Sequence, residues 1–589
     1  MMPTQKNILM GAVGLFILIN TLNFLPTYLL NAPKSVLAVV VPQHNLVAKE
    51  RAEFFTKLSK RAGKPETIIL VSRNHHSAGI GDIQTTSKEW NVETGTVLPD
   101  TNVTLSLISQ NLATDEPTSF KGEDGIATIL SDIHTNFPDA KIVPIILKNV
   151  TEEKLIALEK GLRDACSKCL MIASVDFSRN QPALLAQLHD EKSIRELKTL
   201  NTENLLADVE VDSGPALALL SLWAKGHGAM RFNLQNHKNS GVIANNLDLE
   251  STTHIFGWYE EGAPIEPEKE VSFIIGGDVM FARLINRIYK NDFTDAFSKL
   301  GERVFWGTDA SIINLEGAIT REPISDIVIV NDFSFRFSPR VAEALTFLGV
   351  NAVSLANNHS DNAGEEGVLT TRSVLEKVNI QTFGDSREGG VSRIAKFSGN
   401  GLTLSAIGIN LTYPGQTPDS AVEVIREIKK DPNARVIVMP HWGIEYEPVR
   451  SPQQEAAARL WVDNGADMVI GSHPHVVQDA ELYKNTPIIY SLGNMLFDQT
   501  FGDTKNGLII AGKFTETGVT FFGLPILTEQ YRPRLKKGAA KQEVLERLYI
   551  PFGKNLVTSP AGTQVVLEKE LEEPASPELS EASKKNRRE

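Results

Sequence analysis

The sequence predicts an α/β protein in which two domains follow a single N-terminal transmembrane segment. The chain of 589 residues is long enough for two to four domains. In both halves short apolar runs alternate with helical stretches, which predicts largely parallel sheets. A hydrophobic content of 42% is typical of globular domains, and the net charge of −13 argues against a nucleic-acid partner, because phosphate binding needs basic patches.

Residues 8–30 form the predicted membrane anchor. This segment is mostly apolar, and its length suits one crossing, which takes about 20 residues. Lys6 precedes it and no Ala-x-Ala cleavage site follows, so an anchor is favoured over a cleaved signal peptide, and a buried core helix is a third, weaker reading. We therefore expect residues 1–31 to anchor a single-pass protein in the cell membrane, with its domains extracytoplasmic.

Residues 35–258 form the first predicted domain. Apolar β-branched runs at residues 36–41, 67–71, 141–147 and 170–175 predict buried strands, and residues 48–61 predict a helix. Histidines and an acid follow these strands, and ligands gather at the carboxyl ends of parallel strands. Two interpretations of these residues have equal weight. In one, they form a partial second metal cluster; in the other, the fold serves only for binding or packing. The cluster would comprise His44, His75, His76 and Asp176.

The two cysteines, Cys166 and Cys169, are predicted to form a local disulfide or to remain as free thiols, since a lone Cys-x-x-Cys is poor evidence for zinc. Residues 259–270 are acidic and contain proline, which is typical of an exposed linker. The second domain is predicted over residues 271–530. Residues 531–589 form a C-terminal extension, whose charged end from residue 571 is expected to be disordered.

Polar side chains follow the predicted strands of the second domain. Apolar runs at residues 271–275, 310–313, 352–355, 435–439, 469–470 and 488–491 each end at Asp, Glu, Asn or His. A hydrophobic core needs the apolar runs but not the acids and imidazoles that follow them. Mixed oxygen and nitrogen donors suit Mn, Fe or Zn, and one or two such ions are typical of phosphoester hydrolysis. The sequence therefore predicts a metal site in this half.

The motifs carry two resemblances. The segments Ile68–His76, Phe137–Pro144 and Ala173–Ser178 resemble the Memo-like family, also called AmmeMemoRadiSam system protein B, which is related in fold to class III extradiol dioxygenases. The sequence departs from that family at Gln43 and at Arg179, where histidines are usual. The second half closely resembles the CapA family of poly-γ-glutamate capsule synthesis, within the calcineurin-like metallophosphoesterase fold. Its motifs are Gly277-Asp278-Val279-Met280, Asn314-Leu315-Glu316-Gly317, Ala356-Asn357-Asn358-His359, His441-Trp442-Gly443 and Gly471-Ser472-His473-Pro474-His475.

The second resemblance implies a set of site residues. Implied metal ligands are Asp278, Glu316, Asn358, His441, His473 and His475, with His359 beside them as a general acid or phosphate contact. Met280 stands where ordinary metallophosphoesterases have a histidine, which places one metal subsite in question. Arg283, Arg336 and Asn357 are candidate substrate contacts, although each arginine alone is more often an ordinary surface residue.

These observations favour a membrane-anchored, CapA-like protein of capsule or poly-γ-glutamate biosynthesis that acts as a metal-dependent phosphoesterase-like hydrolase. In that version water attacks phosphorus at the metal site while His359 helps the leaving group. The alternative is a non-catalytic surface subunit that binds or exports an anionic polymer. Expected partners are the membrane, an anionic polymer or phosphoester, and a polymer synthase complex.

Overall fold

The computed structural model describes residues 36–302, 304–322, 324, 333–384, 393–413 and 415–568. The chain divides into two compact units. Unit 1 is Met1–Phe177, Ser193–Lys238 and Thr253–Glu266, and unit 2 is Ser178–Lys192, Asn239–Thr252 and Pro267–Glu589. Two short segments of the N-terminal half therefore pack with the C-terminal half, and each unit is described separately below.

The predicted transmembrane anchor is not supported, which corrects both the fold class and the single-pass membrane location. No helix within the described ranges combines the length and the apolarity that a bilayer crossing requires. Residues 8–30 lie outside the described residues, as do residues 571–589 of the expected disordered tail. The anchor was predicted from the apolar run, its length, Lys6 before it and the missing cleavage site.

Unit 1 is built on a mixed sheet whose central strands are parallel. The apolar runs of the sequence form β1 (Val36–Val41), β2 (Thr67–Arg73), β7 (Lys141–Leu147) and β8 (Cys169–Ser174), which pair side by side in parallel. The sheet has the order β6-β3-β7-β2-β8-β1-β10-β9, in which the outer strands are β6 (Thr114–Asp115), β3 (Ile83–Thr85), β10 (Thr253–Glu260) and β9 (Arg231–Asn239).

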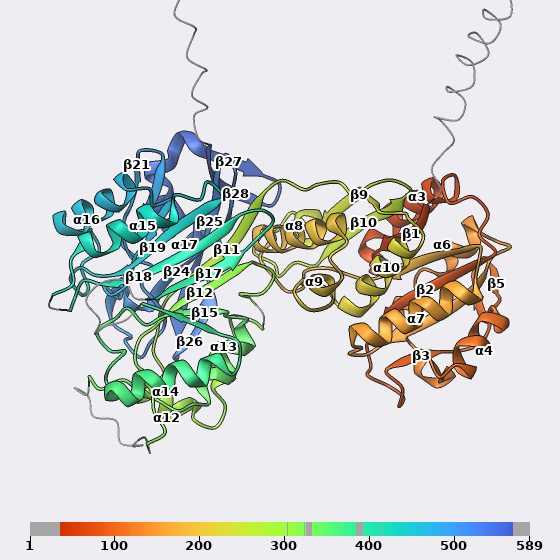
Figure 1. The fold of residues 1–589 in the computed structure, drawn as a ribbon, viewed down its shortest axis with the longest axis horizontal. Helices are drawn as coiled ribbons and strands as arrows, with labels where there is room; N and C mark the ends of the chain where they lie inside the picture. Colours follow the sequence, from red (N-terminus) through yellow and green to blue (C-terminus); the bar gives the residue numbers. More distant parts are fainter. Residues whose placement is uncertain are drawn as a thin grey trace, which may run out of the picture. The chain divides into compact units, whose positions relative to one another are not determined.

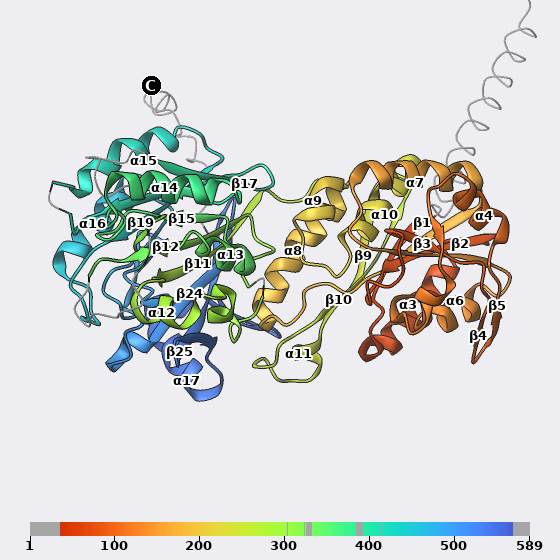
Figure 2. The same ribbon diagram turned by 90° about the horizontal axis from the view of Figure 1, so that it is seen from below.

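Helices cover both faces of this sheet (Figure 2). One face packs against α3 (Ala48–Ser59) and α6 (Leu130–Asn136). The other packs against α4 (Thr101–Ser109), α7 (Glu152–Ala165) and α10 (Gly214–Gly226). In α7 the buried leucines recur at Leu155, Leu158 and Leu162, the spacing that places apolar residues on one side of a helix. Cys166 and Cys169, between α7 and β8, form a disulfide.

Unit 2 is a sandwich of two sheets. The larger sheet runs β16-β15-β12-β11-β24-β25-β28-β27, with β23 paired to β11 and β26 to β25; the smaller runs β17-β18-β19-β20-β22-β21. The strands of the larger sheet are β11 (Glu270–Val279), β12 (Ala310–Leu315), β15 (Ala352–Ser354), β16 (Gln381–Phe383), β23 (Asn494–Leu496), β24 (Asn506–Thr515), β25 (Gly518–Glu529), β26 (Arg532–Leu535), β27 (Leu556–Ser559) and β28 (Gly562–Glu568). Those of the smaller sheet are β17 (Ile394–Ser398), β18 (Thr403–Asn410), β19 (Ala434–His441), β20 (Met468–Ile470), β21 (Ala480–Tyr483) and β22 (Thr486–Ile489).

An apolar core between the two sheets joins residues of both, among them Phe273 on β11 and Ile437 on β19. Outside the sandwich, α12 (Arg283–Tyr289), α13 (Val341–Leu348) and α14 (Gly364–Glu376) lie on one side, and α15 (Val422–Ile428) and α16 (Pro452–Asp463) lie on the other (Figure 1). Two helix ends follow the sequence directly. Gly349 ends α13 at φ +86°, and Ser451 with Gln454 forms a capping box that begins α16.

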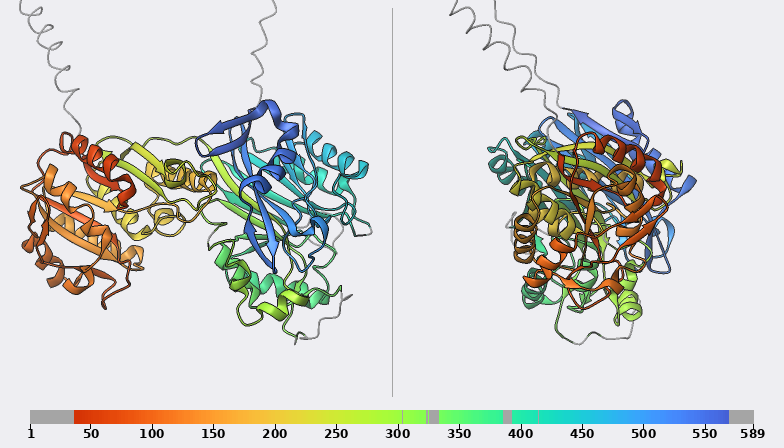
Figure 3. Two further views of the ribbon diagram at one scale, coloured as in Figure 1. Left: turned by 180° about the vertical axis from the view of Figure 1, so that it is seen from behind. Right: turned by 90° about the vertical axis from the view of Figure 1, so that its right-hand side faces the viewer.

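The C-terminal segment, drawn in blue in Figure 3, completes the larger sheet. β24 pairs antiparallel with β11 at the centre of the sheet, and β25 continues from it. Beyond residue 530, β26, α17 (Gly538–Tyr549), β27 and β28 pack onto β25. The segment that the sequence pattern left as an extension therefore contributes strands to the sandwich.

Candidate metal centre

Strands from both sheets end at the same edge of the sandwich and deliver the predicted ligands there. β11 pairs in parallel with β12 and β12 with β15, and in the second sheet β19 pairs in parallel with β20. Because parallel strands present their carboxyl ends at one edge, residues far apart in the chain meet. The residues are Asp278 near the end of β11, Glu316 after β12, Asn358 after β15, His441 at the end of β19, and His473 and His475 after β20.

Asp278, Glu316 and His475 form the first group of potential ligands, with donor atoms that all lie within 4.8 Å of one another. His475 Nδ1 lies 3.3 Å from Asp278 Oδ2, and its Nε2 lies 3.6 Å from Glu316 Oε1. Asn314 donates a hydrogen bond of 2.8 Å to Asp278 Oδ1, which fixes that carboxylate. Glu316 is fully buried, and neither of its carboxylate oxygens accepts a hydrogen bond from any part of the chain that the structure describes.

This group fits a divalent cation. Burying a carboxylate without a hydrogen-bond donor is costly, and a cation between Glu316, Asp278 and His475 would compensate the two carboxylates more fully than the His475 ring, 3.6 Å from Glu316, does alone. The Cβ of a non-glycine residue at 277 would lie 2.0 Å from the Gly493 carbonyl oxygen, so Gly277 is needed for β11 to approach that loop beside the site. The structure therefore contains a His/Asp/Glu group suited to metal binding in the C-terminal region.

His441, His473 and Asn358 lie next to the first group. His441 Nε2 is 2.8 Å from Asn358 Oδ1 and 3.1 Å from His473 Nδ1, and the backbone N–H of His473 lies 3.4 Å from Asp278 Oδ2. His441 Nδ1 is 3.0 Å from Ser472 Oγ. These contacts connect all six predicted ligands in one continuous cluster.

Burial and mutual charge determine the ionisation of the cluster. Burial, reinforced by the neighbouring carboxylate of Asp278, raises the pKa of Glu316 to about 8, even though His475 opposes the shift. For His475 burial acts to lower the pKa, but Glu316 and Asp278 together outweigh it and raise the pKa to about 9. Burial and the charge of His475 lower the pKa of His473 to about 4, and burial also lowers the pKa of His441. His473 and His441 are thus neutral at pH 7, the form in which imidazole binds metals.

The loop after β20 holds two strained residues at the cluster. His473 has φ +96° and His475 has φ +58°, conformations that cost L-residues on the order of 1–3 kcal/mol and persist only where the surroundings impose them. Such strain is concentrated at functional sites. Asn494 Oδ1 lies 3.0 Å from His475 Nδ1 and helps to hold the ring in place.

His359 faces the first group from the loop after β15. Its ring stacks on Phe335 with centroids 4.0 Å apart, its Nδ1 lies 2.9 Å from Asn362 Oδ1, and its Nε2 lies 4.0 Å from Glu316 Oε1. Because Asn362 Oδ1 also accepts from the N–H of Phe335, it is the acceptor, and His359 carries its proton on Nδ1. Burial lowers the pKa of His359, so the ring is neutral at pH 7 and directs an Nε2 lone pair toward Glu316.

The three predicted substrate contacts are engaged with other protein groups. Arg283 forms an ion pair with Asp498 and lies over the ring of Phe335, 4.8 Å from its centroid. Arg336 is exposed and donates to Glu322 and to the carbonyl of Asn362. Asn357 is buried and donates to Asn314 Oδ1 and to the carbonyl of Leu315, so its side chain links the loops below the ligands.

Met280 adds no ligand to the cluster. It is fully buried in the apolar core, and the backbone N–H of Ala282 donates to its sulfur. Met280, which stands where ordinary metallophosphoesterases have a histidine, is therefore part of the hydrophobic packing.

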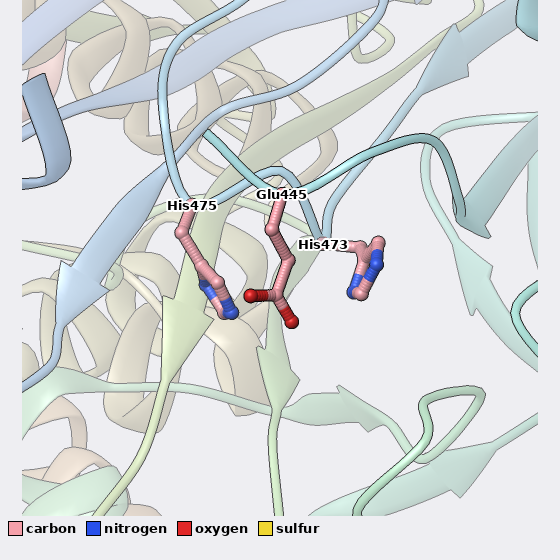
Figure 4. Close-up of side chains that lie close together, drawn as sticks. All are labelled: Glu445, His473 and His475. Carbon is pink, nitrogen blue, oxygen red and sulfur yellow. The ribbon is translucent and has the colours of Figure 1, made fainter. Parts of the chain in front are cut away.

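Glu445 was not predicted and belongs to the site. Its carboxylate forms a second potential ligand group with His473 and His475, whose side chains point toward it (Figure 4). Tyr446 follows at φ +67°, donates its N–H to the carbonyl of Pro474, and stacks edge-on against Phe501 at 5.1 Å. The sequence could have indicated Glu445 only as an acid four residues after His441, on the loop that follows β19. Because Glu445 is exposed, it does not follow an apolar run directly, as the predicted ligands do.

Among the described residues, no potential ligand group unites the four residues of the possible second cluster of unit 1. Both potential ligand groups found among the described residues lie in the C-terminal half. His44 Nδ1 accepts a hydrogen bond from the N–H of Leu46, and His76 Nε2 lies 3.1 Å from the carbonyl of Gly122. His254 Nδ1 lies 3.0 Å from Asp176 Oδ1. The loops after β1, β2 and β8 thus point these side chains to local partners.

His75 is the centre of a different group in unit 1. Its Nδ1 contacts the fully buried Glu123, and its Nε2 lies 3.4 Å from Asp212 Oδ2 and 3.0 Å from Gln43 Nε2. Burial acts to lower the pKa of His75, but the two carboxylates outweigh it and raise the pKa to about 9. Both ring nitrogens are engaged by protein groups, which favours a hydrogen-bonded cluster over a ligand position.

Comparisons with known proteins support the two resemblances. Residues 272–499 match the model of the family described as bacterial capsule synthesis protein PGA_cap, and residues 20–250 match that of Memo-like protein. The chain is 28% identical to the PGA biosynthesis protein CapA of Bacillus subtilis (strain 168) over 293 residues, which cover 46% of this chain and 75% of that protein. It is 26% identical to the capsule biosynthesis protein CapA of Bacillus anthracis over 322 residues, 50% of this chain and 78% of that protein. A MEMO1 family protein of Caldivirga maquilingensis is 26% identical over 223 residues, 35% of this chain and 77% of that protein. Both predicted resemblances are confirmed.

Proposed function

We propose that the C-terminal half of this CapA-like chain is a metal-dependent hydrolase of the metallophosphoesterase type, acting in the biosynthesis of a capsule or of poly-γ-glutamate. The observation that carries the proposal is Glu316, a fully buried carboxylate without a hydrogen-bond donor, beside Asp278 and His475. Neither oxygen of Glu316 accepts a hydrogen bond, and its imidazole neighbours His475, at 3.6 Å, and His359, at 4.0 Å, belong to the same site, so the carboxylate is open to an ion. The similarity to CapA proteins supports the polymer context.

The ligand set suits one or two ions of Mn, Fe or Zn, because it combines imidazole nitrogens with carboxylate and amide oxygens. Asp278, Glu316 and His475 would hold an ion on one side of the cluster, and Asn358, His441 and His473 on the other. When bound, the metal would supply polarisation of a phosphoryl oxygen and a nucleophile at neutral pH.

His359 performs proton transfer in this proposal. With its proton on Nδ1 fixed by Asn362, Nε2 would take up a proton from solvent water, leaving hydroxide in the solvent, and would donate that proton to the leaving oxygen. Phe335 stacks on the ring and keeps it in this orientation. Arg283, although paired with Asp498, adds positive charge beside Glu316 and favours an anionic substrate.

The second candidate function is a protein that binds an anionic polymer without turnover, alone or with a polymer synthase complex. A basic pocket elsewhere in unit 2, described below, favours it. Turnover by the metal-loaded protein separates the two candidates, since both would retain polymer and metal.

The test uses purified full-length protein, mass-spectrometric metal analysis and a panel of phosphomonoesters and phosphodiesters. His473→Ala with His475→Ala removes two nitrogen donors and should lower metal content sharply. His359→Ala should keep the metal but slow hydrolysis about 10²-fold, the typical share of a general acid–base group. His134→Ala is the control, because His134 lies on α6 of unit 1, outside the metal centre. A folded double variant with full metal content would refute the metal centre, and a metal-loaded protein without turnover would favour the binding function.

A further inference from the structure

A basic pocket of about 430 Å³ lies in unit 2 and shares no lining residue with the metal centre. Its walls are residues 298–300 after η3 (Phe293–Phe297), residues 524–525 of β25, residues 534–537 at the end of β26, and Lys541 of α17. Residues 247–250 and Asn180, which cluster with unit 2, close it. The lining comes from segments that no motif of the sequence marked.

Positive charge exceeds negative charge in this pocket. Its basic residues are Lys299, Arg534, Lys536, Lys537 and Lys541, against the acids Asp248 and Glu250. Asp248 is already engaged by Lys541 Nζ at 3.0 Å and by the N–H of Gly538 at 2.7 Å, and Arg534 pairs with Glu529 at 2.8 Å. Such a concentration is unexpected in a chain of net charge −13.

Three of these lysines form no short ion pair within the described residues. Lys299, Lys536 and Lys537 form no ion pair with any residue in the described part of the chain, whereas most other basic groups of unit 2 that line pockets do. Lys536 is half-buried, and burial lowers its pKa, although the carboxylates of Glu543 and Asp503 oppose the shift. Lys299 and Lys537 are exposed and interact with Glu529 and Asp248 only at longer range, so a bound anion would add short contacts to all three ammonium groups.

The floor of the pocket is apolar. Leu300 and Leu524 are each 5% exposed, and Pro525 is buried beside them. The lysine stems also contribute methylene groups to the walls. A ligand that matches both features has several carboxylates spaced along a backbone that contains methylene groups.

We infer that this pocket binds a segment of γ-linked polyglutamate, with its carboxylates on Lys299, Lys536 and Lys537 and its methylene groups over Leu300 and Leu524. The polymer's identity rests on the proposed function, but the site is independent of the metal centre. Polymer held here would keep a long substrate or product on the protein while the metal centre acts on, or binds, another part of it.

The test measures binding of a fluorescent γ-linked glutamate oligomer to full-length protein by anisotropy, at low and at physiological salt, with chelator present. Lys299→Gln, Lys536→Gln and Lys537→Gln combined should weaken binding about tenfold or more, since three charge pairs with the oligomer are lost together. Lys377→Gln, Lys396→Gln and Lys554→Gln combined is the matched control, because it removes the same charge from exposed lysines outside the pocket. This control should bind like the unmodified protein.

Other outcomes are decisive too. Equal weakening in both triple variants would overturn the pocket and indicate a diffuse charge effect, and so would unchanged binding in the pocket variant. Tighter binding of inorganic tripolyphosphate than of the oligomer would overturn the polymer class. The pocket triple variant should keep the metal content of the unmodified protein, so that failure of the metal centre and failure of the pocket are distinguished. Circular dichroism and thermal unfolding verify that each variant is folded.

Discussion

Replacing Glu316 with glutamine should make the metal-free protein more stable and the metal-loaded protein less stable. Glu316 is fully buried, and its pKa rises from 4.5 to about 8 in the folded protein. At pH 7 the unfolded chain ionises this carboxyl freely, about 2.5 pH units above its ordinary pKa, so folding forfeits up to about 3 kcal/mol. Glutamine has nearly the same shape and never ionises, so the variant avoids this cost, and the gain is reduced by the loss of the Glu316 charge that raises the pKa of His475.

The pH dependence has a defined sign. A raised folded-state pKa means that the folded protein binds the proton more tightly, so the destabilisation is absent below about pH 4.5, grows as the pH rises, and levels off above about pH 8. The stability difference between the glutamine variant and the unmodified protein should follow this profile. Excess divalent metal should make the unmodified protein the more stable of the two. A metal ion at 100 times its Kd stabilises the folded protein by about 2.7 kcal/mol, and the glutamine variant, which lacks one anionic side chain at the site, should bind the ion more weakly.

The assay is urea unfolding followed by tryptophan fluorescence, with chelator and then with Mn, Fe or Zn. Trp442 and Trp461, buried and stacked at 5.5 Å in unit 2, report on the unit that contains the site. Glu376→Gln, which replaces an exposed carboxylate of α14, is the control. It should leave the urea midpoint unchanged both in chelator and in metal. The reasoning is refuted if Glu316→Gln is less stable than the unmodified protein in chelator, or if metal stabilises both equally.

Further predictions concern the site and its frame. Glu445→Gln should weaken metal binding in a titration without lowering the urea midpoint in chelator, because the side chain is exposed; an unchanged affinity would exclude Glu445 as a ligand. Gly349→Ala should destabilise unit 2 by more than 1 kcal/mol at ~25 °C, since φ is +86° and its Cβ would lie 1.8 Å from Trp306 Cδ1; an unchanged midpoint would contradict this. Ser451→Ala should cost about 1 kcal/mol by removing the cap of α16, whereas Ser451→Asp, which can also cap, should cost less. His44→Ala should leave the metal content of the C-terminal site unchanged, and a loss would show that unit 1 contributes to it.

The sequence determined the frame of unit 2 because its information is local. An apolar run followed by a polar residue marks a buried strand and its end, and β11, β12, β15, β19 and β20 follow those runs to within a few residues. The helix ends at Gly349 and Ser451 are equally local, since a left-handed residue or a cap acts over one turn. The order of the motifs also carried the two resemblances that the comparisons support.

The tertiary structure decided which of the polar residues meet. Glu445 joins His473 and His475 only because the loop after β19 folds back toward the end of β20, and Arg283 is paired by Asp498, 215 residues away. In unit 1, His44 and His75 both follow parallel strands, yet one caps its own loop while the other lies between Glu123 and Asp212. The basic pocket assembles six segments without a common motif. Strand ends follow from the local apolar pattern, but the direction of a side chain on a loop depends on partners that are distant in the sequence, and only the folded chain brings those partners together.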